Sequence, residues 1–360
     1  MRVLIVTFGD VRKANVGYLI RVSNFIKCIE GENLKVIQFI NDKESFTKEE
    51  DEENTNNIIT IKTSKNYFFT GLSILINSLR FSNLVRWSEV VIFEGSIFVP
   101  FGIMARLMGK KVIHDFHGSI VEISREMKGF RNFAIRRVIG GTLDKLAVII
   151  ANVTTAVSDR DSELVKKMWE RAKTFTVVHG LDINKIPFLS NKNEKMRRLI
   201  FVGNLKAVNN LVAVENLIKI AKDLPNVEFL IIGDGKELIK DPPLNVKLLG
   251  KVDSLDSYYD EADACIVPIT VGTGVKTKVL ECMAYGKPVI TTEKGIEGLE
   301  KARNIKGMYV VPLEEMSKIV DKIKLEKTYP ELRAFVRENF SLATTCRQLR
   351  EVLESLYGRS

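Results

Sequence analysis

The segment VGTGVKTKVLE, residues 271–281, has the composition of an anion-binding loop. Gly272 and Gly274 precede Lys276, and a helix is predicted from about Lys276 to Tyr285. Backbone N–H groups at the start of a helix face outward and, with the helix dipole, bind phosphates. We therefore predict that this segment holds a phosphate group.

Two common phosphate motifs do not fit these residues. A P-loop has glycine directly before its lysine, whereas Val275 precedes Lys276 here. A dinucleotide-binding G-x-G-x-x-G motif needs a third glycine where Thr277 stands. Glu281 lies about one turn inside the predicted helix, and a carboxylate there can accept hydrogen bonds from two adjacent hydroxyls, as in a ribose. A phosphate loop followed by a ribose-binding acid predicts a nucleoside diphosphate site.

The elements that must position these residues are predicted as alternating strands and helices. Short β-rich apolar runs occupy 2–8, 34–40, 58–62, 89–95, 111–116 and 152–158, and longer stretches such as 71–87 have helical period. After the polar stretch 189–198 the pattern restarts, with strands predicted at 198–203, 227–233, 246–250, 264–268 and 288–292. This alternation predicts an α/β fold with two doubly wound parallel sheets, in which ligands bind beyond the carboxyl ends of the strands.

Composition restricts the classes of partner and the compartment. A net charge of +9 over 360 residues favours an anionic partner, and a phosphorylated substrate is one such partner. No apolar run reaches the length of a membrane-spanning helix, and the first residues read as a strand, so a cytoplasmic location is predicted. Cys28, Cys265, Cys282 and Cys346 form no CxxC pair, and we predict buried thiols in place of disulfides or a zinc site.

Two charged segments support separate structural predictions. REMKGFRNFAIRR, residues 125–137, carries five basic residues among aromatic and aliphatic ones. It is predicted either to contact an anionic membrane surface as a peripheral helix or to be an ordinary solvated helix with its aromatics in the core. The acidic run 43–57 is predicted to be an exposed loop.

The longer segment PITVGTGVKTKVLECMAYGKPVITTEKGIEGL (268–299) resembles the donor-binding segment of the family 4 retaining glycosyltransferases, which have the GT-B fold. Five further segments resemble the family in the family's order: 155–161, 177–183, 201–218, 230–238 and 248–268. The resemblance implies two Rossmann-like domains facing an interdomain cleft. Residues 1–185 would bind the acceptor, 186–335 the nucleotide sugar, and a C-terminal helix in 336–360 would return to the first domain.

The activity implied by the resemblance is transfer of a sugar from a nucleotide-diphosphate sugar with retention of anomeric configuration. A UDP-sugar is favoured over a GDP-sugar, and the acceptor would be a hydroxyl of a saccharide or lipid-linked saccharide. No metal and no cofactor other than this donor substrate is implied, and no nucleic acid partner. Two alternatives stay open, a non-catalytic nucleotide-sugar-binding partner and a nucleotide-sugar epimerase of the same fold.

The resemblance also implies site residues. Glu281 would bind the ribose, His117 would stand beside the transferred sugar, and Lys276 would supply positive charge at the diphosphate. The other residues implied at the donor are Gly17, Gly203, Asn204, Lys206, Gly233, Gly235, Lys251, Val252, Gly272, Thr273, Gly274, Val275 and Thr277.

Three positions depart from the family pattern. Thr273 stands where many members have a sugar-contacting glutamate, and Asn204 and Asn209 stand where an arginine and a lysine are frequent. Either activity is reduced, or a nearby lysine (Lys206, Lys276 or Lys278) replaces the missing cations, and we favour replacement.

The chain has only three histidines, and their surroundings differ. His114 falls within an apolar strand pattern and is predicted to be packed, whereas His117 follows the strand and is the site candidate. His179 is predicted to be structural, near the hinge between domains. Asp159 and Asp161, in the motif DRD, are read as a helix cap and not as metal ligands.

Overall fold

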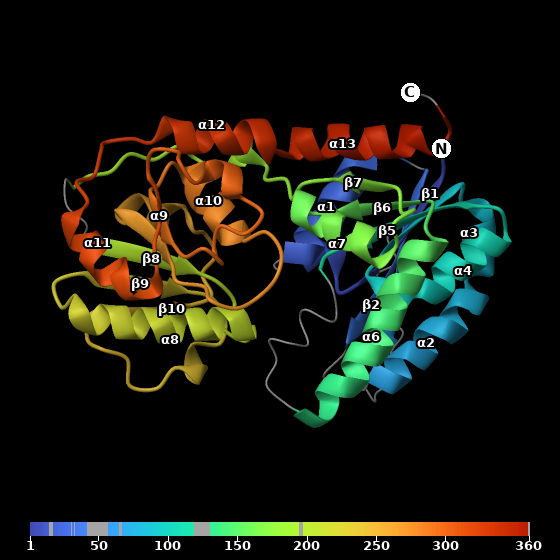
Figure 1. Cartoon of the computed structure of the whole chain (residues 1–360), viewed down its shortest axis with the longest axis horizontal. Coiled ribbons are helices and arrows are strands. Elements are labelled where there is room, and N and C mark those ends of the chain that lie inside the picture. The colour runs from blue at the N-terminus through green and yellow to red at the C-terminus, as the bar shows by residue number, and fades with distance from the viewer. Residues whose placement is uncertain are drawn as a thin grey trace. The chain divides into compact units, whose positions relative to one another are not determined.

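The computed structural model describes residues 1–13, 17–29, 31, 33–41, 57–64, 67–118, 130–193 and 197–358. The chain forms two compact units: unit 1 comprises Met1–Val178 and Thr345–Ser360, and unit 2 comprises His179–Thr344. Each unit contains one parallel sheet with helices on it (Figure 1). The predicted α/β class with two Rossmann-like units is therefore confirmed, while the roles assigned to the units stay predictions.

Unit 1 is built on a seven-stranded sheet in the order β3-β2-β1-β4-β5-β6-β7. Its strands are β1 (Val3–Phe8), β2 (Leu34–Asn41), β3 (Ile58–Thr63), β4 (Val90–Glu94), β5 (Lys111–Phe116), β6 (Val153–Ala156) and β7 (Thr174–Thr176). All pairs are parallel, with Val3 opposite Leu34 and Val90 in the two neighbours of β1. Strand order reverses between β1 and β4, which is where such sheets bind ligands.

Helices cover both faces of this sheet. One core cluster joins the sheet to α2 (Tyr67–Arg80), α3 (Ser82–Trp87), α4 (Val99–Leu107) and α6 (Phe130–Ile150). The opposite cluster joins it to α1 (Gly17–Ile29) and α13 (Leu342–Ser355). Helix α7 (Asp159–Met168) packs beside α6 and the last two strands. The last helix of the chain thus belongs to the core of unit 1.

Unit 2 repeats the plan with six strands in the order β10-β9-β8-β11-β12-β13. The strands are β8 (Arg198–Val202), β9 (Glu228–Ile232), β10 (Val246–Gly250), β11 (Ala264–Val267), β12 (Val289–Thr291) and β13 (Met308–Val310). The helices are α8 (Val208–Asp223), α9 (Asp256–Glu261), α10 (Thr277–Tyr285), α11 (Met316–Lys322) and α12 (Pro330–Asn339). Strand order reverses between β8 and β11.

The predicted elements differ from the observed ones in four places. Strands β7 and β13 were not predicted, because each has only three residues and too short an apolar run. The stretch 71–87, predicted as one helical segment, contains most of α2 and all of α3, with Phe81 at the break. Helix α7 is capped by Ser158, whose Oγ accepts from the Asp161 N–H at 3.2 Å, so the DRD aspartates lie inside the helix and not at its cap.

The prediction of free thiols is wrong for all four cysteines. Cys28 of α1 is bonded to Cys346 of α13, and Cys265 of β11 is bonded to Cys282 of α10. These pairs are 318 and 17 residues apart in sequence, so only the packing of helix on helix and helix on strand brings them together. The spacing of cysteines along the sequence reveals short motifs such as CxxC. It does not reveal pairs that only the fold brings together.

Two sequence predictions concern residues outside the described part of the chain. Most of the acidic run 43–57 lies there, as do residues 125–129 and the side chains of 130–137. Contact of residues 125–137 with a membrane surface therefore stays a prediction. Among the described residues, no helix is both long and apolar enough to span a bilayer.

Candidate functional site

The candidate donor site of unit 2 lies where its strand order reverses. The loop after β8 begins at Gly203, and the loop after β11 contains Gly272 and Gly274 before α10 starts at Thr277. A Cβ added at Gly272 would lie 3.1 Å from the Cβ of Asn209, so the two loops are in contact through the first turn of α8. The structure thus brings the predicted residues of both loops to one edge of one sheet.

Gly203 and Gly233 meet so closely that no side chain fits between them. A Cβ at Gly233 would stand 1.9 Å from the carbonyl oxygen of Gly203, and Gly233 has a φ of +149°. The Gly203 N–H donates to Ile232 O at 2.9 Å, and the Leu205 N–H donates to Asp234 O at 2.8 Å. Backbone therefore lines this part of the edge, so a ligand can approach the main chain closely.

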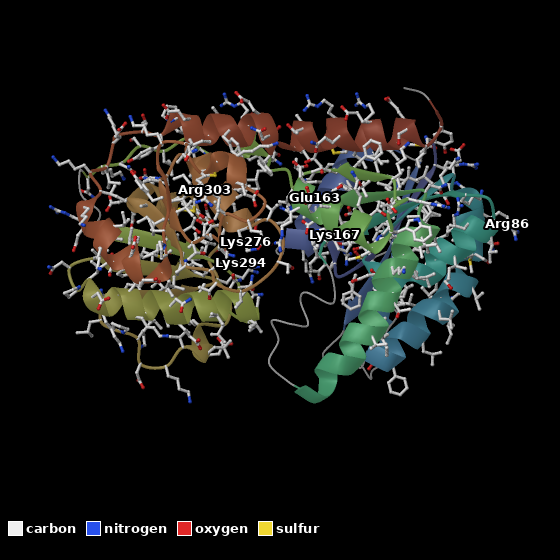
Figure 2. The ribbon with its side chains drawn as sticks, in the orientation of Figure 1. Arg86, Glu163, Lys167, Lys276, Lys294 and Arg303 are labelled. Carbon is white, nitrogen blue, oxygen red and sulfur yellow. A yellow bond between two sulfur atoms is a disulfide. The ribbon has the colours of Figure 1, made fainter. Side chains whose placement is uncertain are left out.

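Lys276 organises the glycine loop from within. Its side chain is 3% exposed, and its Nζ donates to the carbonyl oxygens of Gly274 at 2.5 Å and Gly272 at 3.5 Å. The carboxylate of Glu297 lies 4.0 Å from Lys276 Nζ and 2.8 Å from Lys294 Nζ, and the two lysines are neighbours in Figure 2. Gly272, at φ +104°, and Gly274, at φ +72°, take conformations that favour glycine. The carbonyl groups of Gly272 and Gly274 thus hold the Lys276 ammonium group against the loop.

Helix α10 presents its amino end beside this loop. Lys276 is the N-cap and makes no side-chain cap hydrogen bond, and the first N–H groups of a helix have no acceptor within it. Val275 and Thr273 are partly buried residues of the same loop. Predicted residues from Gly272 to Thr277 therefore form a continuous run of backbone leading to the positive end of a helix dipole.

Glu281 lies one turn further along α10 and is partly buried. Burial raises the pKa of Glu281 to about 7, although the Lys278 ammonium acts in the opposite direction. Burial likewise lowers the pKa of Lys278 to about 8, and its Nζ lies 5.8 Å from the Phe201 ring centroid of β8. The carboxyl group therefore exchanges its proton near neutral pH when no ligand is present.

Four further predicted residues of unit 2 (Asn204, Lys206, Gly235 and Lys251) lie around Asp234, after β9, and Val252 follows Lys251 after β10. Lys206 Nζ donates to Asp234 Oδ2 at 2.7 Å, and its N–H donates to Asn204 Oδ1 at 3.0 Å. A Cβ at Gly235 would lie 3.1 Å from Lys206 N. Lys251 acts electrostatically on Asp234 and helps to lower the pKa of that carboxyl, after the Lys206 hydrogen bond. Lys206 is half-exposed, so this pair is available to an incoming anion.

Unit 1 carries a separate charged cluster at the carboxyl end of β5. Arg21 of α1 and Asp115 are both almost completely buried, and Arg21 Nε and Nη2 donate to the carboxylate at 2.9 and 2.8 Å. Thr155 Oγ1 donates to the same carboxylate at 2.5 Å. Although burial opposes the charge, the Arg21 guanidinium holds the pKa of Asp115 well below its usual range.

His117 lies between two acids in this cluster. Its Nε2 is 2.9 Å from Asp115 Oδ2 and 3.2 Å from Glu94 Oε1. Burial alone would lower the pKa of His117, but the Asp115 carboxylate raises it above its usual value. Burial raises the pKa of Glu94 to about 7. Thr7 Oγ1 donates to Glu94 where the strand order reverses between β1 and β4. The imidazole, 21% exposed, is thus favoured as a cation held by two carboxyl groups.

The other histidines and Gly17 occupy different positions. His114 is fully buried and stacks on Phe93 with ring centroids 4.9 Å apart, so the prediction of a packed histidine is confirmed. His179 is buried and is the first residue of unit 2, where a structural role was predicted. Gly17 begins α1. The structure therefore places Gly17 and His117 in unit 1 and all other predicted site residues in unit 2.

Several polar residues of these sites were not predicted. Arg21, Thr7 and Glu94 were missed, and Glu297 was not connected with Lys276. The one available signal was a charged residue inside an otherwise apolar strand or helix face, as with Glu94 in EVVIFEG. Their partners are distant in sequence, and only the fold pairs them.

Sequence comparison supports the assignment for part of the chain. Residues 196–325 match the family model described as Glycosyl transferases group 1. These residues all lie in unit 2, which is therefore similar to the domain that this family model describes. The match includes both glycine loops, Lys276 and Glu281 and does not extend to unit 1. A comparison with curated protein sequences gave no match.

Solved structures share the fold over the full length. Sucrose-phosphate synthase from Thermosynechococcus elongatus superposes with a TM-score of 0.74 at 14% identity, covering 100% of each chain. HepE from Anabaena, solved with UDP and glucose, gives 0.69 at 15% identity, covering 98% of this chain and 99% of its own. The lipopolysaccharide outer core galactosyltransferase WaaB gives 0.68 at 14% identity and 99% coverage of each chain. At these identities the likeness establishes the fold, which is the GT-B fold of these glycosyltransferases.

Proposed function

We propose that this protein is a family 4 retaining glycosyltransferase that moves a sugar from a nucleotide-diphosphate sugar, preferably a UDP-sugar, to a hydroxyl group. The observation that carries the proposal is the edge of the unit 2 sheet, where Gly203, Gly233 and the Gly272–Thr277 loop surround the amino end of α10. The group 1 family match covers this edge, and HepE, of the same fold, was solved with UDP.

In this proposal unit 2 binds the donor through its backbone. The diphosphate lies against the loop N–H groups and the amino end of α10, which favour negative charge. Lys276, held under the loop, adds a positive charge that cannot move away. Glu281 accepts hydrogen bonds from the two ribose hydroxyls, and Lys251 and Val252 border the base.

The bond to the anomeric carbon breaks as negative charge develops on the leaving diphosphate. Fixed N–H dipoles and Lys276 stabilise that charge without reorganising, which is where the catalytic effect arises. Asn204 and Asn209 carry no positive charge at the diphosphate. Lys206, in the loop after β8, supplies that charge in their place. The acceptor proton passes to a leaving phosphate oxygen on the same face of the sugar, so neither a flanking carboxylate pair nor a metal is required.

His117 is proposed to contact the transferred sugar. The two carboxyl groups beside it, Asp115 and Glu94, hold the ring in place and favour its protonated form. A protonated imidazole donates hydrogen bonds to sugar hydroxyls from the nitrogen that the acids leave free. The acceptor is proposed to be a saccharide or a lipid-linked saccharide, reached from the cytoplasmic side.

The test is a transfer assay with radiolabelled UDP- and GDP-sugars and a panel of saccharide and lipid-linked acceptors. We expect turnover with a UDP-sugar, and transfer or slow hydrolysis that is about 10-fold or more lower in Lys276→Met, since hydrogen bonds to a charged group contribute about 1.5–3 kcal/mol each. Lys240→Met, an exposed lysine of unit 2 outside the site, is the matched control.

The outcome also separates the alternatives. Tight UDP-sugar binding with neither transfer nor hydrolysis would contradict the enzyme proposal and support a non-catalytic binding partner. Conversion of one UDP-sugar into its epimer without an acceptor would support the epimerase alternative. Anomeric configuration of the product, read by NMR, tests retention, and activity in the presence of EDTA tests independence of metal.

A further inference from the structure

Helix α2 of unit 1 has its apolar and polar sides reversed relative to an ordinary surface helix. Five large apolar side chains are exposed at intervals of three and four residues, so they share one face: Phe69, Leu72, Leu75, Ile76 and Leu79, between 44% and 65% exposed. In a helix that faces water, these positions would carry charged or polar residues.

The buried side of α2 is unusually polar. Thr70, Asn77 and Ser78 are buried together with Ile74, and their polar atoms bond locally. Thr70 Oγ1 donates to Ser64 O at 2.6 Å, Asn77 Nδ2 to Ser73 O at 2.8 Å, and Ser78 Oγ to Leu75 O at 2.7 Å. Because these groups are satisfied, the helix is stable in this orientation, and its exposed apolar face is a feature of the fold.

The neighbouring helices also expose apolar side chains. α4 contacts both α2 and α6, and all three pack on the same side of the sheet through one core cluster (Figure 1). On their outer sides α4 exposes Ile103 and Leu107, and α6 exposes Val138, Ile139 and Ile149. We call the exposed residues of these three helices the apolar layer. Exposed apolar side chains gathered on adjoining helices are typical of an interaction site.

Among the described side chains of α2, α3, α4 and α6, the exposed charges have a single sign. Helices α2, α3 and α4 contain no Asp or Glu, and the only acid of α6, Asp144, is buried and accepts from Ser96 Oγ at 2.6 Å. Arg80, Arg86 and Arg106 are exposed at the ends of α2, α3 and α4, and Arg86 extends from the surface in Figure 2. Apolar side chains bordered by cations complement a partner that has an apolar interior and anionic groups at its surface.

We propose that the apolar layer docks unit 1 onto an anionic lipid surface, with the α2 side chains inserted among the acyl chains and the arginines at the headgroups. A second copy of the chain fits less well. In a symmetric dimer the same patch faces itself, so Arg80, Arg86 and Arg106 of the two copies would repel each other, and the described part of these helices exposes no acid to offset them. This inference does not depend on the transfer reaction.

The test is flotation of the full chain with vesicles, without any donor. We expect binding to vesicles of equal phosphatidylglycerol and phosphatidylcholine and at least tenfold weaker binding to phosphatidylcholine alone. Leu75→Gln/Leu79→Gln is expected to lose at least tenfold in affinity for the anionic vesicles. Leu238→Gln/Leu244→Gln is the matched control in unit 2, where both leucines are exposed, at 47% and 96%, and we expect no change.

A charge variant tests whether the arginines lie at the anionic headgroups. Arg80→Gln/Arg106→Gln is expected to weaken binding to anionic vesicles by about fivefold for each arginine, and the loss disappears at high salt. Thermal unfolding of each variant is expected to match the parent, because the changed side chains are exposed.

Three results would overturn the inference. Wild-type protein that does not float with anionic vesicles would do so, and so would an α2 variant that binds as well as its control. A wild-type dimer in solution that Leu75→Gln/Leu79→Gln converts to a monomer would assign the apolar layer to a second copy. Failure of the sugar-transfer assay would leave each of these results unaffected.

Discussion

The pKa of Glu281 leads to a defined pH dependence of donor binding. Burial raises this pKa to about 7 in the free protein, so the carboxyl group is largely protonated below pH 6. A ribose that donates two hydrogen bonds stabilises the carboxylate, and the pKa in the complex falls toward the ordinary value of 4.5. Donor binding then releases a proton at acidic pH, and affinity rises with pH up to about 7.

The magnitude follows from the two pKa values. Between pH 5.5 and pH 7.5, a shift from about 7 to about 4.5 gives an affinity change of about 20-fold, with tighter binding at pH 7.5. UDP-glucose is the suitable ligand for calorimetry, because its diphosphate diester does not titrate in this range, unlike the terminal phosphate of UDP. Proton release on binding is measured in the same titrations by using buffers of different ionisation enthalpy.

Glu281→Gln is the control that isolates this group. The amide has similar size and does not titrate, so its UDP-glucose affinity is expected to be lower than that of the parent at pH 7.5 and nearly constant down to pH 5.5. If the variant retains the 20-fold dependence, another group such as His117 is responsible and the role assigned to Glu281 is wrong. If the parent shows no dependence, no titrating carboxyl group receives the ribose.

Two further predictions concern the frameworks of the two sites. Arg21→Met leaves the buried Asp115 carboxylate without its guanidinium and is expected to lower the free energy of unfolding of unit 1 by about 3–5 kcal/mol, with part of the loss restored in Arg21→Met/Asp115→Asn; a loss below about 1 kcal/mol in urea unfolding would contradict the pairing. Gly233→Ala is expected to weaken UDP-glucose binding and to destabilise unit 2 by more than Gly274→Ala does, because the added Cβ would lie 1.9 Å from Gly203 O, whereas at Gly274 no atom lies within 4 Å. At Gly274 only the positive φ opposes alanine, at a cost of about 1–2 kcal/mol; equal effects of the two changes would contradict the close approach of the loops.

The sequence predicted most of the architecture because the relevant signals are local. The eleven predicted strands are short runs rich in apolar and β-branched residues, as expected for parallel sheets covered on both faces by helices. The loop 271–276 and the start of α10 were recognised from adjacent residues, and the structure places them as expected. Strands β7 and β13 gave too few residues for any such signal.

What the sequence did not predict depends on pairs of residues distant in the chain. Arg21 and Asp115 are 94 residues apart, and the cysteines of α1 and α13 are 318 residues apart. The pattern of α2 was misleading in another way, since helical spacing of apolar residues usually identifies the side that faces the core. In α2 the larger apolar residues face outward, and only the packing of Ile74 against the sheet reveals which side is which.

The composition of unit 1 has a consequence for biosynthesis. Its core contains Val3 and Ile5 from the beginning of the chain and Leu349, Val352 and Leu353 from α13 at the end. On a ribosome the first 178 residues therefore emerge without the helix that covers one side of their sheet. The intervening residues His179–Thr344 form a contiguous unit that can complete its own sheet while synthesis continues. Unit 1, whose first strands are made before unit 2, is thus completed after it, and the apolar strand residues beneath α13 stay uncovered until that helix has been synthesised.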